Sequence, residues 1–212
     1  MLASHFQTVR TRVEAEVKLH SIIMVTSAKA DDGAKLTAFG LAECLASAGH
    51  QTALIDAAAN PDAAVNGRFK TKARCGFPIY AMPEGDGTQS RARDALESLE
   101  RQVREEFDYT IIDAPPFMHH NVTVALARTV DAVVVTLRLG RKPSKADQFT
   151  LHALGRAGAR VLGIIAVTPE SIEHFDEVGG AQYIADPIRR VAAHAANGTT
   201  GAGMQIRARR AR

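Results

Sequence analysis

The sequence predicts an α/β fold, a doubly wound domain built on a mostly parallel sheet. Short runs of residues are apolar throughout rather than alternating, which is typical of strands buried on both faces of a parallel sheet. Segments with helical character separate these runs, so a helix joins most successive strands. Such crossovers are right-handed and place helices on both faces of the sheet. The chain has 212 residues, of which 46% are hydrophobic, and this length and composition support one domain with a real core.

The expected strands follow the apolar runs in chain order. They are residues 21–27, 52–55, 77–82, 109–112, 132–137 and 161–167. The expected helices are residues 34–49, 91–106, 122–129 and 145–157, and Gly49 is a typical stop for the first of them. Residues 57–75 have weak periodicity, and residues 83–88 are rich in turn-forming residue types.

The composition argues against several classes of protein. No apolar run approaches the ~18–20 residues that span a bilayer, and the first eighteen residues lack the apolar core of a secretory signal. The two cysteines, Cys44 and Cys75, are too few for a disulfide framework and lack the spacing of metal ligands. We therefore expect a cytoplasmic protein.

Basic charge is concentrated at the C-terminus. The formal net charge is +3, and four arginines lie near the chain end, at positions 207, 209, 210 and 212. The rest of the chain is close to neutral, so nucleic-acid binding by the body of the domain is not expected. We expect residues 195–212 to form a flexible basic tail that could contact an anionic membrane at the inner face of the cell.

Three loops follow the carboxyl ends of predicted strands, where open α/β sheets bind their ligands. They are residues 28–33, 56–61 and 113–116. The second begins with Asp56 and the third with Asp113. The first joins a strand to a helix through small residues, which is the geometry of a phosphate cradle.

That first loop departs from the usual phosphate-binding pattern, G-x-x-x-x-G-K-[ST]. The corresponding residues, 28–35, read AKADDGAK. Gly33 matches the second glycine, but Ala34 takes the place of the lysine and Lys35 that of the hydroxyl residue. The pattern taken alone therefore leaves the ligand of this loop open.

The surrounding sequence resembles the bacterial tyrosine kinases of capsule and exopolysaccharide synthesis, relatives of the MinD and ParA ATPases. TSAKADDGAKLTAFGLAECLASAGHQTALIDAAANP is similar to their TSAKPGEGKTTTALNLAEALAxxGxxVLLIDADxRxP, and FDYTIIDAPP is similar to their Walker B segment, FDxVIIDxPP. SHFQTVRTRV resembles their E-x-F-R-T-L-R-T-N helix, which assembles rings. The likeness covers about residues 4–167.

The resemblance implies a MinD/ParA-like P-loop NTPase fold over residues 1–194, with an assembly helix within residues 1–20. It also implies ATP and Mg²⁺ as cofactors and a homo-oligomer. By resemblance, Asp56 and Asp113 are the Walker A′ and Walker B aspartates, which act in catalysis and bind Mg²⁺.

The same resemblance assigns nucleotide-binding positions in the first loop. Lys29 matches the signature lysine, and Gly33, Ala34 and Lys35 match the end of the cradle. Ala34 lacks the ammonium that the family directs at the phosphates, and Lys35 lacks the hydroxyl that it gives to Mg²⁺. Asp31 adds a negative charge where the family has glycine. These departures predict a degenerate loop with weak or no phosphoryl transfer, which depends on positioning and charge neutralisation.

Three functional hypotheses follow. The first is a pseudo-kinase or pseudo-ATPase that acts as a binding or regulatory partner of a membrane polysaccharide co-polymerase or of the export machinery. The second is an active tyrosine kinase or ATPase with a rearranged loop, in which Lys29 and Lys35 bind the phosphates. The third is a MinD/ParA-like positioning protein that uses the arginine tail.

Overall fold

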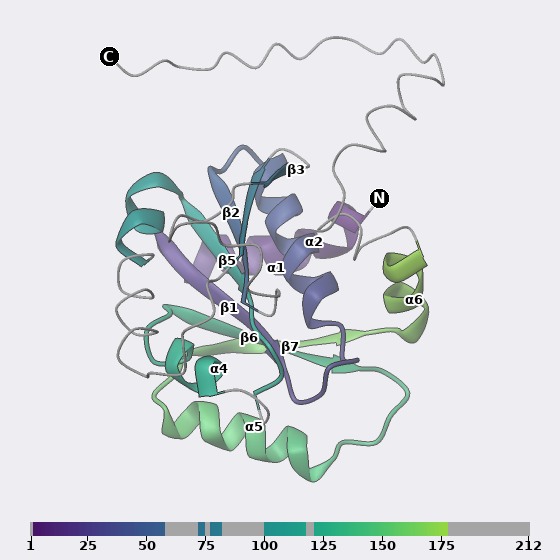
Figure 1. Ribbon diagram of the computed structural model, residues 1–212. Coiled ribbons are helices and arrows are strands. Elements are labelled where there is room, and N and C mark those ends of the chain that lie inside the picture. The colour runs from purple at the N-terminus through teal and green to yellow at the C-terminus, as the bar shows by residue number, and fades with distance from the viewer. Residues whose placement is uncertain (1, 58–71, 75–76, 82–99, 118–120, 178–212) are drawn as a thin grey trace, which may run out of the picture.

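The strands form a single seven-stranded sheet in the computed structural model, which describes residues 2–57, 72–74, 77–81, 100–117 and 121–177 (Figure 1). The strand order is β3-β4-β2-β5-β1-β6-β7, and every neighbouring pair is parallel except β3 with β4. The strands are β1 (Ser21–Ser27), β2 (Thr52–Asp56), β3 (Lys72–Arg74), β4 (Phe77–Ala81), β5 (Tyr109–Asp113), β6 (Ala132–Arg138) and β7 (Val161–Val167). The expected doubly wound, mostly parallel fold is confirmed.

Helices cover both faces of this sheet. They are α1 (Leu2–Glu16), α2 (Ala34–Ser47), α4 (Asn121–Leu126), α5 (Lys145–Arg156) and α6 (Pro169–Glu177), and residues 100–106 are also helical. The helix α2 ends where the glycine predicts, since Gly49 has a left-handed φ of 97°. Two elements were not expected from the sequence, the antiparallel β3 and the helix α6.

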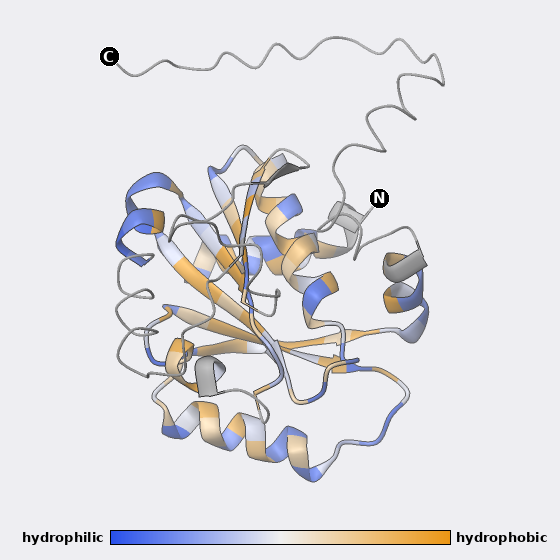
Figure 2. Cartoon of the chain, in the orientation of Figure 1, coloured by the Kyte–Doolittle hydropathy of each residue, from blue (hydrophilic) through white to orange (hydrophobic). Residues whose placement is uncertain are grey.

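Alternation along the central strand explains why there are two apolar layers. Ile23 and Val25 of β1 pack with α1, α2 and α6, whereas Ile22 and Met24 pack with α4, α5 and the helical residues 100–106. Successive side chains of a strand point to opposite faces, so an apolar run supplies both layers at once. Figure 2 shows apolar colour along the central strands of the sheet and a mixture of apolar and polar colour on the helices.

Several expectations fall on residues outside the described ranges. These are the turn-rich residues 83–88, the first part of the helix 91–106, and the basic tail 195–212. The boundary of the domain at residue 194 therefore stays a prediction. Among the described residues, no helix combines the length and the apolar character needed to span a membrane.

The helices α1 and α2 pack closely at Gly40. The ring of Phe6 in α1 lies over the Gly40 Cα, and a Cβ atom at this position would overlap the ring. Phe6 is buried, so the ring has little room to move aside. This contact fixes how α1 rests on the domain.

We expect Gly40→Ala to lower the free energy of unfolding by about 1–3 kcal/mol, because the new methyl group displaces the Phe6 ring. Urea unfolding followed by circular dichroism measures this loss. The matched control is Gly155→Ala in α5, where a Cβ atom would meet nothing within 4 Å. That variant is expected to be neutral or to stabilise by about 0.5–1 kcal/mol, since alanine favours the helix. Equal effects of the two substitutions would contradict the packing argument.

Candidate functional site

Two aspartates end neighbouring strands and lie side by side. Asp56 of β2 and Asp113 of β5 are paired positions in the parallel register, and their exposed fractions are 3% and 5%. The two strands stay joined past this point, because the Ala57 N–H donates to the Asp113 carbonyl at 2.9 Å. Burial of two carboxylates so close together is unfavourable unless a cation or a proton compensates for their charge.

Lys35 supplies a cation to this pair. It stands in the first turn of α2, and its Nζ lies 3.6 Å from the Asp56 Oδ2. A proton is the second form of compensation. Burial, and then the charge of Asp56, raise the pKa of Asp113 to about 7, although Lys35 acts in the opposite direction. The three residues thus form one electrostatic unit at the carboxyl edge of the sheet.

The loop between β1 and α2 depends on Gly33. This residue is the N-cap of α2 and has the left-handed dihedrals φ 80° and ψ 24°, which glycine adopts without strain. A Cβ atom here would also lie 3.1 Å from Val167 and 3.3 Å from Ile172. Its carbonyl accepts the first helical hydrogen bond, from the Thr37 N–H at 3.0 Å. Gly33 therefore sets both the turn of the loop and its approach to β7 and α6.

The start of the same loop is held by its own backbone. The Lys29 carbonyl accepts a hydrogen bond from the Ser27 hydroxyl at 2.6 Å and one from the Asp32 N–H at 3.3 Å. The Lys29 side chain is exposed, as is that of Asp31. The extra carboxylate of Asp31 therefore points to solvent rather than into the protein.

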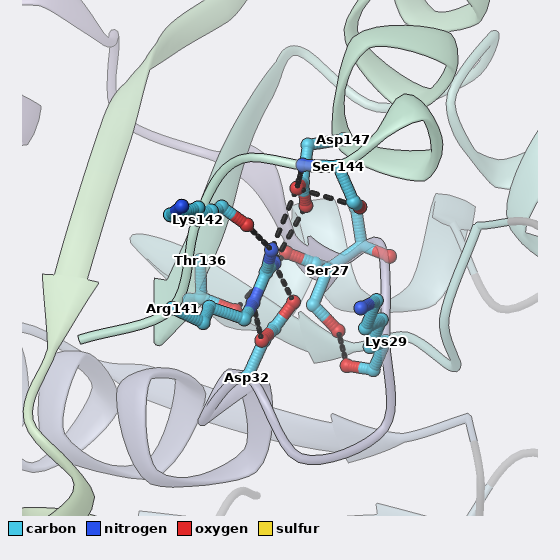
Figure 3. Close-up of polar contacts among 9 residues, drawn as sticks. Ser27, Lys29, Asp32, Thr136, Arg141, Lys142, Ser144 and Asp147 are labelled. Atoms are coloured by element: carbon cyan, nitrogen blue, oxygen red, sulfur yellow. Dashed lines mark hydrogen bonds and ion pairs between the residues drawn. The ribbon is translucent and has the colours of Figure 1, made fainter. Parts of the chain in front are cut away.

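Asp32 is the buried acid of the loop, and Arg141 neutralises it (Figure 3). The Arg141 Nε and Nη2 donate to the two Asp32 carboxylate oxygens at 2.8 and 2.6 Å. The Arg141 Nη1 and Nη2 also donate to the Asp147 carboxylate, both at 2.6 Å. One guanidinium thus joins the loop after β1 to the start of α5, in the forked geometry that arginine favours.

The start of α5 prepares Asp147 for this contact. Ser144 and Asp147 form a capping box, in which the Ser144 N–H and hydroxyl donate to the Asp147 carboxylate at 2.6 and 2.8 Å. Hydrogen bonds from Arg141, and then those from Ser144, hold the pKa of Asp147 well below its usual range. The bonds to Asp147 and Asp32 likewise raise the pKa of Arg141. The Arg141 and Asp147 side chains are therefore charged at neutral pH.

A further set of bonds holds the segment after Asp113 against β1. The Pro115 carbonyl accepts hydrogen bonds from the Thr26 hydroxyl at 2.9 Å and the Thr123 hydroxyl at 3.0 Å. The Phe117 N–H donates to the Ser27 carbonyl at 2.9 Å. The DAPP segment is thus fixed beside the loop that carries Lys29, at the same edge of the sheet.

The structure brings together some of the predicted site residues and separates others. Lys35, Asp56 and Asp113 form one group, and Gly33 shapes the loop beside them. Ala34 is buried in the apolar layer with α2 and presents no polar group. Arg141 was not predicted from the sequence, because its partner Asp32 is 109 residues away. The S-x-x-D spacing of residues 144–147 is the only local signal, and it indicates a structured helix start nearby.

The donor set fits Mg²⁺ poorly. Magnesium prefers oxygen ligands, which Asp56 and Asp113 offer, but the position that supplies a hydroxyl in the usual pattern carries the Lys35 ammonium. An ammonium donates hydrogen bonds and cannot ligate a metal. Among the described residues, no group of three or more His, Cys, Asp or Glu side chains could hold a metal ion.

Comparisons with known proteins agree with the fold and the motifs. No protein-family model matches the chain. Tyrosine-protein kinase CpsD of Streptococcus agalactiae is 24% identical over 201 residues, which cover 82% of this chain and 87% of that protein. Succinoglycan biosynthesis transport protein ExoP of Rhizobium meliloti (strain 1021) is 25% identical over 172 residues, covering 68% of this chain and 22% of that protein.

Solved structures show the same architecture. The kinase domain of the Escherichia coli tyrosine kinase ETK matches with a TM-score of 0.67 and 20% identity, over 79% of this chain and 76% of that one. Cobyrinic acid a,c-diamide synthase from Mycobacterium smegmatis, solved with ADP and magnesium, matches with a TM-score of 0.56 and 15% identity, over 70% and 74% of the two chains. The predicted P-loop fold and the resemblance to bacterial tyrosine kinases are therefore confirmed.

Proposed function

We propose that this chain, which resembles the bacterial tyrosine kinases and has their P-loop fold, is a degenerate kinase or ATPase that acts as a binding or regulatory partner. Its partner would be a membrane polysaccharide co-polymerase or the export machinery, contacted from the cytoplasm. The single observation that carries the proposal is the Lys35 ammonium 3.6 Å from the Asp56 carboxylate, next to a buried Ala34. The Lys35 ammonium is directed at an acid of the domain rather than left for a triphosphate.

The physical reason is the loss of two electrostatic interactions. Phosphoryl transfer depends on positioned cations that neutralise the developing charge. One preorganised donor can be worth about 2.7–4 kcal/mol, or roughly 10²–10³ in rate. The alanine at position 34 removes the phosphate-directed ammonium, and the lysine at position 35 removes the metal-directed hydroxyl. Both changes weaken the same step.

The names of the relatives support the biological setting. CpsD carries the name of a tyrosine-protein kinase, and ExoP that of a succinoglycan biosynthesis transport protein. A chain with the fold of such proteins, but without their phosphate-binding groups, would act in that setting by contact rather than by phosphoryl transfer.

One observation favours the active-enzyme alternative. The Lys35 side chain is 42% exposed, so its ammonium could leave Asp56 and bind a phosphate. In that case Lys35→Ala would lower nucleotide affinity at least tenfold, a loss of about 1.4 kcal/mol or more. If the loop is degenerate, the natural chain binds no nucleotide and Lys35→Ala changes nothing.

The test is a titration of the purified chain with a fluorescent ATP analogue and Mg²⁺, combined with a phosphate-release assay. We expect no micromolar binding and no turnover above that of Asp113→Asn. A double variant, Ala34→Lys with Lys35→Thr, restores both groups of the usual pattern and is expected to gain about tenfold or more in affinity. Micromolar binding by the natural chain, with turnover that Asp113→Asn abolishes, would refute the proposal.

A genetic test separates partner binding from catalysis. In a deletion strain that has lost polysaccharide export, we expect Asp113→Asn to restore polymer as fully as the natural chain does. Rescue by the natural chain alone, with Asp113→Asn equally abundant in the cell, would contradict the proposal, because the function in the cell would then require Asp113.

A further inference from the structure

We infer that the Lys35 ammonium is a built-in substitute for a divalent metal ion at the Asp56–Asp113 pair, and that it keeps this pair closed to free Mg²⁺. The inference deepens the proposed function, on whose site it rests, by stating which ion the site excludes and which residue excludes it. It concerns the chain without nucleotide and needs no activity to be tested.

The register of the sheet creates the demand for a cation. Asp56 and Asp113 are directly paired on β2 and β5, and each is at least nine-tenths buried. Adjacent parallel strands lie about 4.8 Å apart, so the two carboxyl groups leave their strands close together on the same edge. Two buried acids on neighbouring strands attract a cation, whether metal or ammonium.

The start of α2 supplies that cation from within the chain. Lys35 is the second residue of the helix, and its Nζ is 3.6 Å from the Asp56 Oδ2. Asp113 is the register partner of Asp56 on the neighbouring strand, so the ammonium beside Asp56 also lies near the second carboxyl group. A single positive charge therefore acts on both aspartates, as a bound metal ion would.

The Lys35 ammonium competes with a metal ion for the two carboxylates and cannot itself act as a metal ligand. The hydroxyl of the usual pattern is an oxygen ligand, whereas an ammonium donates three hydrogen bonds and accepts none. A lysine at position 35 therefore removes one metal ligand and adds a positive charge that repels the metal. Because the lysine is covalently attached, its effective concentration at the pair is high and does not depend on the supply of ions.

The test uses Mn²⁺ as the probe, with free Mn²⁺ measured by electron paramagnetic resonance in the full, nucleotide-free chain. We expect the natural chain to bind Mn²⁺ weakly, and Lys35→Ser to bind it about tenfold more tightly or better. Lys35→Gln, which keeps the length of the side chain without its charge, is expected to show a smaller gain in the same direction. Either variant suffices if the other fails to fold.

Two controls locate the effect. Lys142→Ser removes an exposed lysine from the loop after β6, at the same edge of the sheet, and is expected to leave Mn²⁺ affinity unchanged. Lys35→Ser combined with Asp113→Asn is expected to lose the gain, because one of the two carboxylates is then missing. A Mn²⁺-dependent rise in melting temperature, present only in Lys35→Ser and Lys35→Gln, is the second readout.

The results of the Mn²⁺ titration can be distinguished from those of the ATP assay that tests the proposed function. Binding of Mn²⁺ by the natural chain as tightly as by Lys35→Ser would overturn the inference, even if the chain showed no ATP turnover. Folded Lys35→Ser and Lys35→Gln variants with no gain would overturn it equally. Turnover of ATP by the natural chain would refute the proposed function, whereas weak Mn²⁺ binding without nucleotide would still support the inference.

Discussion

Replacing Arg141 by glutamine is expected to lower the free energy of unfolding by about 3–5 kcal/mol, the usual cost of removing one partner from a buried ion pair. The substitution leaves the Asp32 carboxylate, which is 2% exposed, without its two guanidinium hydrogen bonds. It also removes both guanidinium bonds to Asp147. An uncompensated charge then remains buried within the loop that follows β1.

Urea unfolding at neutral pH measures this loss, and an exposed arginine provides the control. Arg160 lies 3.8 Å from Glu16, with exposed fractions of 56% and 38%, so Arg160→Gln is expected to cost no more than about 1 kcal/mol. Similar small losses for both substitutions would show that the Arg141 cluster does not hold the loop.

A second variant shows where the cost of removing Arg141 arises. If the buried charge of Asp32 is responsible, Asp32→Asn should recover part of the stability that Arg141→Gln loses. Arg141→Lys should be less stable than the natural chain, because an ammonium cannot bind two carboxylates through a planar fork. A double variant no more stable than Arg141→Gln alone would argue against the buried charge as the cause.

Asp113→Asn is expected to stabilise the domain, and the gain should grow with pH. Burial and the charge of Asp56 raise the pKa of Asp113 from 3.8 to about 7, so the folded chain holds a proton that the unfolded chain has released. The stability of the natural chain therefore falls as pH rises from about 4 to 7, and it levels off above the folded pKa. Asparagine is neutral in both states and avoids this loss.

The expected gain is near zero at about pH 4 and on the order of 2–4 kcal/mol at about pH 8. Thermal and urea unfolding at these two pH values measure it, and Asp31→Asn, which changes an exposed carboxylate of the neighbouring loop, is the control. A gain from Asp113→Asn that is the same at both pH values, or a loss at the higher one, would show that the charge of Asp113 is not what destabilises the folded chain.

Both predictions concern charges buried at the carboxyl edge of the sheet, which is also where the proposed function differs from phosphoryl transfer. Arg141 satisfies one acid of the loop, and Lys35 pairs with an acid of β2. Both cations therefore form ion pairs with buried aspartates of the same domain. A binding or regulatory role requires the fold to be stable without a nucleotide, and these contacts supply part of that stability.

Local patterns in the chain already encoded the parallel sheet and the placement of its two aspartates. A strand that is apolar throughout can be recognised from the local sequence alone, and Asp56 and Asp113 follow such strands directly. Gly49 was predicted as a helix stop and Gly33 as a glycine of the loop pattern, and both have the left-handed backbone that glycine adopts without strain. Family motifs then added the P-loop fold, which the solved structures bear out.

Contacts between distant segments depended on the folded arrangement. The pairing of Arg141 with Asp32 spans 109 residues, and no local sequence pattern predicts it. The partner of the Lys35 ammonium could not be predicted locally either. Its contact with Asp56 depends on where the end of β2 lies relative to the start of α2. Periodicity and turn chemistry act over a few residues, whereas the partner of a buried charge is selected by the topology that brings remote strands and loops to one edge of the sheet.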